Sequence, residues 1–201
     1  MGRHPRLPSE TGYYHVVSRG NQRQRLFHER ADYAQYCRVL TTAYRARQIT
    51  VAHFCLMPNH VHLLLHAPAL SQLSAAMHDV QRRYWFWTRR QHGCTGHLWQ
   101  GRFHSFPITD AAYLLEAARY IERNALEPKL VNAIAEYPWS SYGVYALGQR
   151  SPWLSLTPAP TYTALGKTWR ARQKAYRQFV DTPHPYDRGA RRILQTVTAY
   201  A

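Results

Sequence analysis

The spacing of apolar residues changes several times along this chain, and the order of these changes limits the folds available to it. Alternation predicts a strand, whereas recurrence every three or four residues predicts a helix. Strands are predicted at residues 13–19, 49–56, 60–66 and 102–108, and helices at residues 31–48, at residues 70–90 and from a cap at Thr109 or Asp110 to about Asn124. This order is typical of a ferredoxin-like, split βαβ fold. We therefore expect an α+β domain with one antiparallel sheet and helices on one face.

The length of 201 residues accommodates one such domain with an appendage. Residues 1–11 are polar and basic and are predicted to form a flexible arm, and residues 12–146 hold the predicted domain. Residues 147–201 are predicted to be a basic C-terminal extension or tail. Within them, residues 152–160 contain three prolines and are typical of a linker, and residues 167–180 are a candidate for a basic helix.

Lysine and arginine outnumber aspartate and glutamate by 26 to 11, which gives a formal net charge of +15 at pH 7. This excess predicts a polyanionic partner, because basic groups that neutralise phosphates release condensed counterions. Only three of the basic residues are lysines, and arginine grips phosphates and stacks on bases, so nucleic acid is favoured over a membrane surface. Three unpaired cysteines and the lack of a membrane-length apolar run favour the cytoplasm, in association with the nucleoid.

His60 and His62 lie two residues apart in a predicted strand, so both imidazoles point to the same face of the sheet. Adjacent imidazoles are a natural pair of metal ligands, and by themselves they favour zinc or a similar transition metal. The same spacing also occurs on ordinary polar sheet surfaces. The pair alone therefore leaves a metal site and a polar surface open as alternatives.

Tyr120 and Asn124 lie four residues apart on the last helix of the predicted domain, so their side chains share a face. Asn124 could lend its amide oxygen to a cation, and Tyr120 could be a nucleophile. An aromatic residue at the edge of the core, with Asn124 as a helix C-cap, explains the same pattern. Spacing alone leaves both interpretations open.

Several segments resemble, in order, the motifs of the HUH single-tyrosine transposases, and of the REP-associated tyrosine transposases within the IS200-like transposases in particular. They are residues 12–21 (GYYHVVSRGN), 57–64 (MPNHVHLL), 99–103 (WQGRF), 119–124 (RYIERN) and 139–142 (WSSY). The family usually has a proline after the asparagine of RYIERN, where this chain has Ala125. That position lies outside the chemistry.

The resemblance implies that residues 12–146 are an HUH tyrosine transposase catalytic domain. His60 and His62 would bind a divalent metal, Mg²⁺ or Mn²⁺, with Asn124 as a third ligand. Tyr120 would attack single-stranded DNA and give a 5′-phosphotyrosine and a free 3′-hydroxyl, so that the strand can be transferred without ATP. The implied substrate is an imperfect hairpin of the repetitive extragenic palindrome type, flanked by a short guide sequence.

Basic residues in four places are candidate contacts to the DNA backbone. One group adjoins the first strand, one lies on the helix predicted at residues 70–90, one is in the WQGRF motif, and one could clamp the hairpin stem. They are Arg19, Arg23 and Arg25; Arg82 and Arg83; Arg102; and Arg170, Arg172, Lys174 and Arg177.

Two other functions are compatible with the same residues. A domesticated relative could bind DNA hairpins without cutting them, and a metal-dependent nuclease could use an activated water instead of Tyr120. Relatives that consist of the catalytic domain alone act as dimers that exchange the tyrosine helix, whereas the REP-associated members resemble monomers. We expect a monomer here, with a dimer as the alternative.

Overall fold

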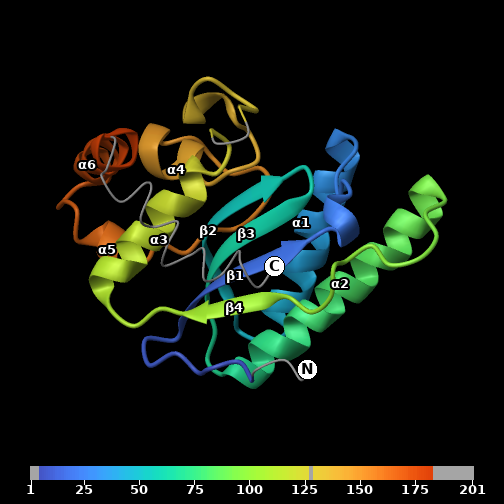
Figure 1. Cartoon of the computed structure of the whole chain (residues 1–201). Helices are drawn as coiled ribbons and strands as arrows, with labels where there is room; N and C mark the ends of the chain where they lie inside the picture. Colours follow the sequence, from blue (N-terminus) through green and yellow to red (C-terminus); the bar gives the residue numbers. More distant parts are fainter. Residues whose placement is uncertain (1–4, 127–128, 183–201) are drawn as a thin grey trace.

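The computed structural model describes residues 5–126 and 129–182 (Figure 1). Its centre is a four-stranded sheet of β1 (Tyr13–Arg19), β2 (Thr50–Met57), β3 (His60–His66) and β4 (His104–Pro107). The strand order is β2-β3-β1-β4, and all neighbouring strands are antiparallel. The helices α1 (Arg30–Arg45) and α2 (Leu70–His92) make the two crossovers. The predicted α+β, ferredoxin-like topology is therefore confirmed.

The register of the strands separates the sheet into two different faces. Val16 on β1 and Phe54 on β2 both pair with Leu63 on β3, so these apolar side chains share one face. The opposite face carries His15 and His62, together with apolar residues. Both faces need a cover, because β1, β2 and β3 are buried along most of their length.

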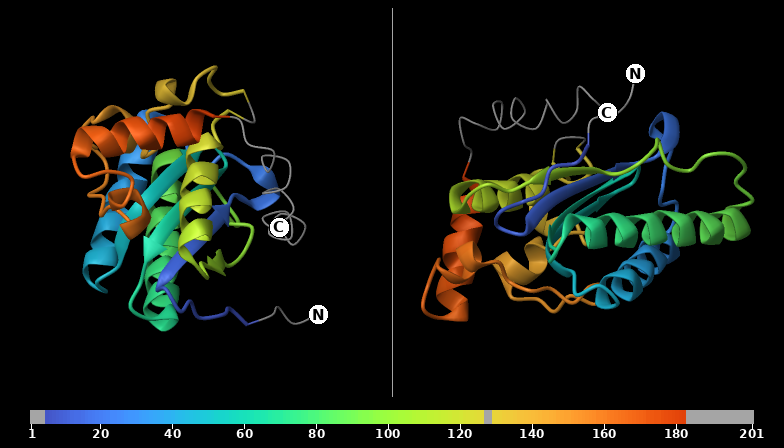
Figure 2. Two further views of the ribbon diagram at one scale, coloured as in Figure 1. Left: turned by 90° about the vertical axis from the view of Figure 1, so that its left-hand side faces the viewer. Right: turned by 90° about the horizontal axis from the view of Figure 1, so that it is seen from below.

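Helices cover both faces. The crossover helices α1 and α2 lie on one face, as expected, where Gln81 of α2 contacts the Ser18 hydroxyl of β1. The next helix, α3 (Ala111–Arg123), packs on the histidine-bearing face, where it contacts β2 and β3 (Figure 2). The expectation of helices on one face thus describes the crossovers, and α3 adds a layer on the second face, where its own apolar residues Leu114, Ala118 and Ile121 are buried.

Local signals explain most of the helix ends. The predicted cap Asp110 accepts a hydrogen bond from the Tyr113 N–H at 2.8 Å and so begins α3. The helix α1 ends three residues before the predicted position, since Gln48 adopts a left-handed φ of 56° and turns the chain into β2. The helix α2 ends at Gly93, whose φ is 64°. Two short 3-10 turns complete this part, η1 (Asn21–Arg23) and η2 (Ile134–Glu136).

The C-terminal part forms α4 (Tyr142–Leu147), α5 (Pro160–Thr163) and α6 (Trp169–Asp181). The helix α6 confirms the basic helix predicted there. These helices share a second apolar cluster that includes Tyr145, Tyr162 and Tyr176. The proline-containing stretch between them lies along the sheet edge, where the Thr157 N–H donates to the Val51 carbonyl at 2.9 Å. The proposed division after residue 146 stays a prediction.

The ends of the predicted arm and tail, residues 1–4 and 183–201, lie outside the described residues. The described part of the arm contacts the domain, since Arg6 donates to the Phe103 carbonyl at 3.0 Å and Thr11 to the Ile108 carbonyl at 2.7 Å. Among the helices that the structure describes, none combines the length and the apolar character that crossing a membrane requires.

A buried polar cluster joins α3 to the sheet and to α4. The Glu122 side chain is fully buried, and its Oε1 lies 2.9 Å from His53 Nδ1 on β2. The Ser141 hydroxyl, at the start of α4, donates to the same oxygen at 2.6 Å and accepts the Phe54 N–H at 2.9 Å. The Tyr176 hydroxyl of α6 lies 3.4 Å from His53 Nδ1. Glu122 therefore connects three elements of the domain and lies close to a fourth.

We predict that Glu122→Ala lowers the free energy of unfolding by about 3 kcal/mol, because it leaves His53 and Ser141 buried without their shared acceptor. Urea denaturation followed by circular dichroism measures this change. The matched control is Glu116→Ala, on the same helix, whose side chain is 40% exposed and lies 3.5 Å from Arg119. It is expected to change stability by less than about 0.5 kcal/mol. Equal effects of the two substitutions would contradict a structural role for the buried carboxylate.

Candidate functional site

Three side chains that are distant in the sequence converge on the histidine-bearing face. His60 and His62 follow each other on the same face of β3, with ring centroids 4.9 Å apart. Tyr120 comes from α3, and its ring centroid lies 5.6 Å from that of His62. The predicted pair of ligands and the predicted nucleophile are therefore brought together.

The hydrogen bonds of the two histidines leave the same nitrogen of each ring available. Asn59 Oδ1 lies 2.7 Å from His60 Nδ1, and because this oxygen can only accept, the proton of His60 is on Nδ1. His62 Nδ1 lies 2.9 Å from His15 Nε2. A proton on Nδ1 of each ring leaves the Nε2 electron pair as the ligand, an arrangement common in metal-binding histidines.

His15 was missed by the sequence analysis. It lies on β1, is fully buried, and its ring stacks on that of His62 with 5.2 Å between centroids. Its Nδ1 has no hydrogen-bond partner among the described residues. The alternation of β1 places His15 and Val17 on one face, but only the pairing of β1 with β3 brings that face to His62.

Burial keeps these imidazoles neutral at pH 7. It lowers the pKa of His15 to about 3. Burial, and then the charge of Arg19, lower the pKa of His60 to about 4. The pKa of His62 falls well below its usual value through burial and then through His60, His15 and Arg19. Neutral imidazoles retain the electron pair that a metal ligand must supply.

Asn124 lies at the C-cap of α3 and is 7% exposed. Its amide Nδ2 donates to the Tyr120 carbonyl at 2.8 Å, which leaves the amide oxygen as the atom that could face a cation. The two interpretations of Asn124 are thus compatible, because the bond that caps the helix uses only the nitrogen.

The predicted contacts Arg19, Arg23 and Arg25 border this site. Arg19 ends β1 opposite His60, and the Tyr120 hydroxyl is close enough to raise the pKa of Arg19 against the larger lowering by burial and by Arg23. Arg23 and Arg25 are exposed on the loop that follows. Gly20 allows this loop to fold back, because a Cβ there would lie 2.2 Å from the Gln24 carbonyl oxygen.

The predicted DNA contacts on α2 and in the WQGRF motif line two different surface hollows. Arg82 and Arg102 border a hollow between α2 and the loop that follows it. Arg83 borders a smaller hollow between α1 and α2. All three side chains are exposed.

The predicted contacts of the C-terminal extension lie elsewhere. On α6, Arg170, Lys174 and Arg177 are exposed, whereas the Arg172 Nε donates to the Gly166 carbonyl at 2.7 Å. The helices α6 and α2 lie at opposite ends of the molecule (Figures 1 and 2). The structure therefore does not gather all the predicted DNA contacts on one surface, and their roles stay predictions.

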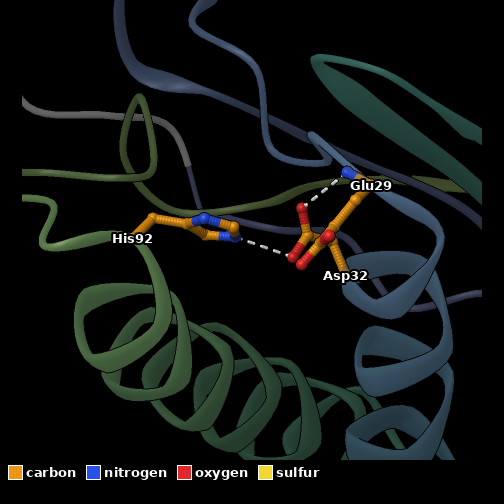
Figure 3. A group of neighbouring side chains, drawn as sticks. All are labelled: Glu29, Asp32 and His92. Carbon is orange, nitrogen blue, oxygen red and sulfur yellow. Dashed lines mark hydrogen bonds and ion pairs between the residues drawn. The ribbon is translucent and has the colours of Figure 1, made fainter.

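A second group of metal-ligand residue types, Glu29, Asp32 and His92, lies where α1 begins and α2 ends (Figure 3). Both Asp32 oxygens are already used. One lies 2.8 Å from His92 Nε2, and the other accepts the N–H groups of His28 and Glu29 at 2.6 and 3.1 Å. This group caps α1 and ties it to α2, on the other face of the sheet from Tyr120.

Comparisons with known proteins found two solved structures that are similar to this chain. A solved REP-associated tyrosine transposase bound to a REP hairpin is similar over 80% of this chain and 96% of its own, with a TM-score of 0.63 and 17% identity. A presumed transposase from Deinococcus radiodurans R1 covers 61% of this chain and 95% of its own, with a TM-score of 0.41 and 19% identity. A search of curated proteins gave no significant match.

The family assignment comes from the sequence. The family model described as "Transposase IS200 like" matches residues 9–124, which is more than half of the 201 residues. The matched range includes the histidine pair, Tyr120 and Asn124. Members of this family cleave DNA and generally use a divalent metal. The chain therefore belongs to the IS200-like transposase family, as its motifs predicted.

Proposed function

We propose that this transposase nicks a single-stranded DNA hairpin and transfers the strand through a 5′-phosphotyrosine at Tyr120. The observation that carries this proposal is the convergence of His60, His62 and Tyr120 on one face of the sheet, with ring centroids 4.9 and 5.6 Å apart. A nucleophile next to a pair of metal ligands is the arrangement that phosphodiester cleavage needs.

The residues of the site fit a divalent metal. His60 and His62 would each offer Nε2, since their Nδ1 atoms are engaged by Asn59 and His15. Asn124 would offer its amide oxygen. This mixed set of nitrogen and oxygen ligands suits Mn²⁺, and Mg²⁺ as the family's other ion. A bound metal would polarise the phosphate and stabilise the charge that develops on its oxygens.

Tyr120 would form the covalent bond. Its phenolic oxygen bonds to phosphorus, the bond from phosphorus to the 3′ oxygen breaks, and that oxygen takes up a proton to become a 3′-hydroxyl. The new ester retains the energy of a phosphodiester, so a 3′-hydroxyl can later displace Tyr120 and complete the transfer. Arg19 would hold the phosphate beside Tyr120 through its guanidinium.

The proposed substrate is a hairpin of the repetitive extragenic palindrome type. The similar solved transposase is bound to a REP hairpin, and the net charge of +15 suits a polyanion. We also propose a monomer that acts in the cytoplasm on the nucleoid. Contacts within the chain support the monomer, since Arg119 and Arg123 on the tyrosine helix donate to carbonyls of Phe179 and Val180 on α6.

Tyr120→Phe is expected to abolish the covalent adduct, because it removes the nucleophilic oxygen and leaves the ring. The measurement is a denaturing gel after incubation with Mn²⁺ and a labelled hairpin oligonucleotide from the genome's own repeats. Wild-type protein should give a slow-migrating, protease-sensitive band. Tyr113→Phe, on the same helix, is the matched control and should retain this band.

The other outcomes of this experiment identify the alternatives. Cleavage that persists in Tyr120→Phe would mean that an activated water cuts the strand and that the chain is a metal-dependent nuclease. Tight binding by the wild type without an adduct, over several hairpins and metals, would mean that the chain is a binding protein.

His15→Phe is expected to lower the rate of adduct formation about 10- to 100-fold and to raise the half-saturating Mn²⁺ concentration. The physical reason is that Phe keeps the ring and removes the acceptor that holds His62 Nδ1 at 2.9 Å. The measurement is adduct yield against Mn²⁺ concentration.

The matched control is His66→Phe, because His66 lies on the same face and packs against Tyr13 with 5.0 Å between ring centroids. It should leave the Mn²⁺ dependence unchanged. A His15→Phe variant that melts at a lower temperature with an unchanged Mn²⁺ dependence would show that His15 has only a packing role.

A further inference from the structure

A hollow lies between α2 and the loop that leads from it towards β4. Its volume is about 580 Å³, which is within the range of about 300–1,000 Å³ typical of pockets for small ligands. Trp85 and Trp99 line it together with Arg82 and Arg102, and none of its lining residues is acidic. The hollow thus combines aromatic rings with positive charge.

The two tryptophans are held by their edges. The Trp85 Nε1–H donates to the Gly96 carbonyl at 3.0 Å, and the Trp99 Nε1–H donates to the Gln81 carbonyl at 2.9 Å. One bond is donated from α2 to the loop and the other from the loop to α2. Together they satisfy the only polar group of each indole. Both rings remain partly exposed, so what they offer a ligand is an apolar face.

Positive charge surrounds these rings. Arg82 and Arg102 are exposed at the hollow, and the Arg89 guanidinium lies 5.6 Å from the centroid of Trp85. Aromatic faces beside guanidinium groups recognise unpaired nucleobases, because the base stacks on the ring while the arginine neutralises the adjacent phosphate. A lipid headgroup or a free anion would use the charge and leave the indole faces without a partner.

The hollow adjoins the end of the strand that carries Arg19. The Gln100 N–H donates to the Arg19 carbonyl at 2.9 Å, and Gly20 and Trp99 form an antiparallel bridge. Within β1, Arg19 points to the face that carries Tyr120, whereas Ser18 points to the α2 side, where Gln81 contacts it. The hollow and Tyr120 therefore lie on the two sides of one strand end.

We propose that this hollow binds an unpaired nucleobase of the DNA, a few nucleotides from the phosphate that Tyr120 attacks. The inference rests on the proposed function, because it assumes a single-stranded substrate that passes around the end of β1. The site would fix the position of the strand relative to Tyr120, by stacking the base on Trp85 and Trp99.

The test measures the binding of fluorescent single-stranded hexanucleotides by anisotropy at one salt concentration. The probes are the four homopolymers and an abasic hexamer, which carries the same phosphates without bases. Wild-type protein should bind at least one homopolymer about 10-fold more tightly than the abasic hexamer. Trp85→Leu should lose this difference, whereas Arg82→Ala should weaken the binding of all probes alike.

Arg90→Ala is the matched control for charge, since Arg90 is exposed on the same helix and does not line the hollow. It should preserve the preference for bases. Equal binding of homopolymers and abasic hexamer by the wild type, or an unchanged preference in Trp85→Leu, would overturn the proposal. If Trp85→Leu fails to fold, photocrosslinking of the wild type to 5-iodouracil hexamers decides, and crosslinks that map only outside residues 78–102 overturn it.

The adduct assay separates this proposal from the proposed function. If the adduct forms at Tyr120 but Trp85→Leu leaves the preference for bases unchanged, only the proposed nucleobase site in the hollow is wrong. If the preference for bases depends on Trp85 but the protein forms no adduct, only the proposed nicking function is wrong.

Discussion

The buried carboxylate of Glu122 is the interaction on which the position of Tyr120 depends. Glu122 lies two residues after Tyr120, so its bonds to His53 and Ser141 fix the rotation of α3 about its own axis. A carboxylate in the interior is costly unless it is paired, and here one oxygen is paired with His53 of β2 and with Ser141 at the start of α4. Turning or sliding α3 would therefore break both of these bonds. Tyr120 is held toward His62 as a result.

The side chains of His60 and His62, the proposed metal ligands, are also held by polar partners. Asn59 and His15 engage the Nδ1 atoms of His60 and His62, so these hydrogen bonds orient each ring. Burial adds to this by lowering the pKa of His15 to about 3 and keeping the ring neutral. The orientation of the two histidines and the position of Tyr120 thus depend on separate sets of hydrogen bonds that meet on one face of the sheet.

The C-terminal helix α6 also holds α3 in place. Carbonyl groups at the end of α6 accept from Arg119 and Arg123, the residues just before and after the segment that carries Tyr120 and Glu122. Cations at a helix C-terminus also interact favourably with its dipole. The motifs RYIERN and WSSY, which the sequence shows only as separate strings, meet physically in the bond from Ser141 to Glu122. The support of α3 is therefore shared between the sheet and the C-terminal part.

The sequence by itself determined the properties that depend on neighbours along the chain. Strand alternation and helical spacing gave the order of elements and the common faces of His60 with His62 and of Tyr120 with Asn124, because periods of two and of 3.6 residues are local. Tertiary structure alone decided the contacts that join distant segments. His15 meets His62 only through the register of β1 and β3, and α3 covers the histidine-bearing face through its contacts with β2 and β3. The hollow exists because the loop containing Trp99 is bonded to α2. Such contacts depend on strand register and packing, which spacing along one chain does not encode.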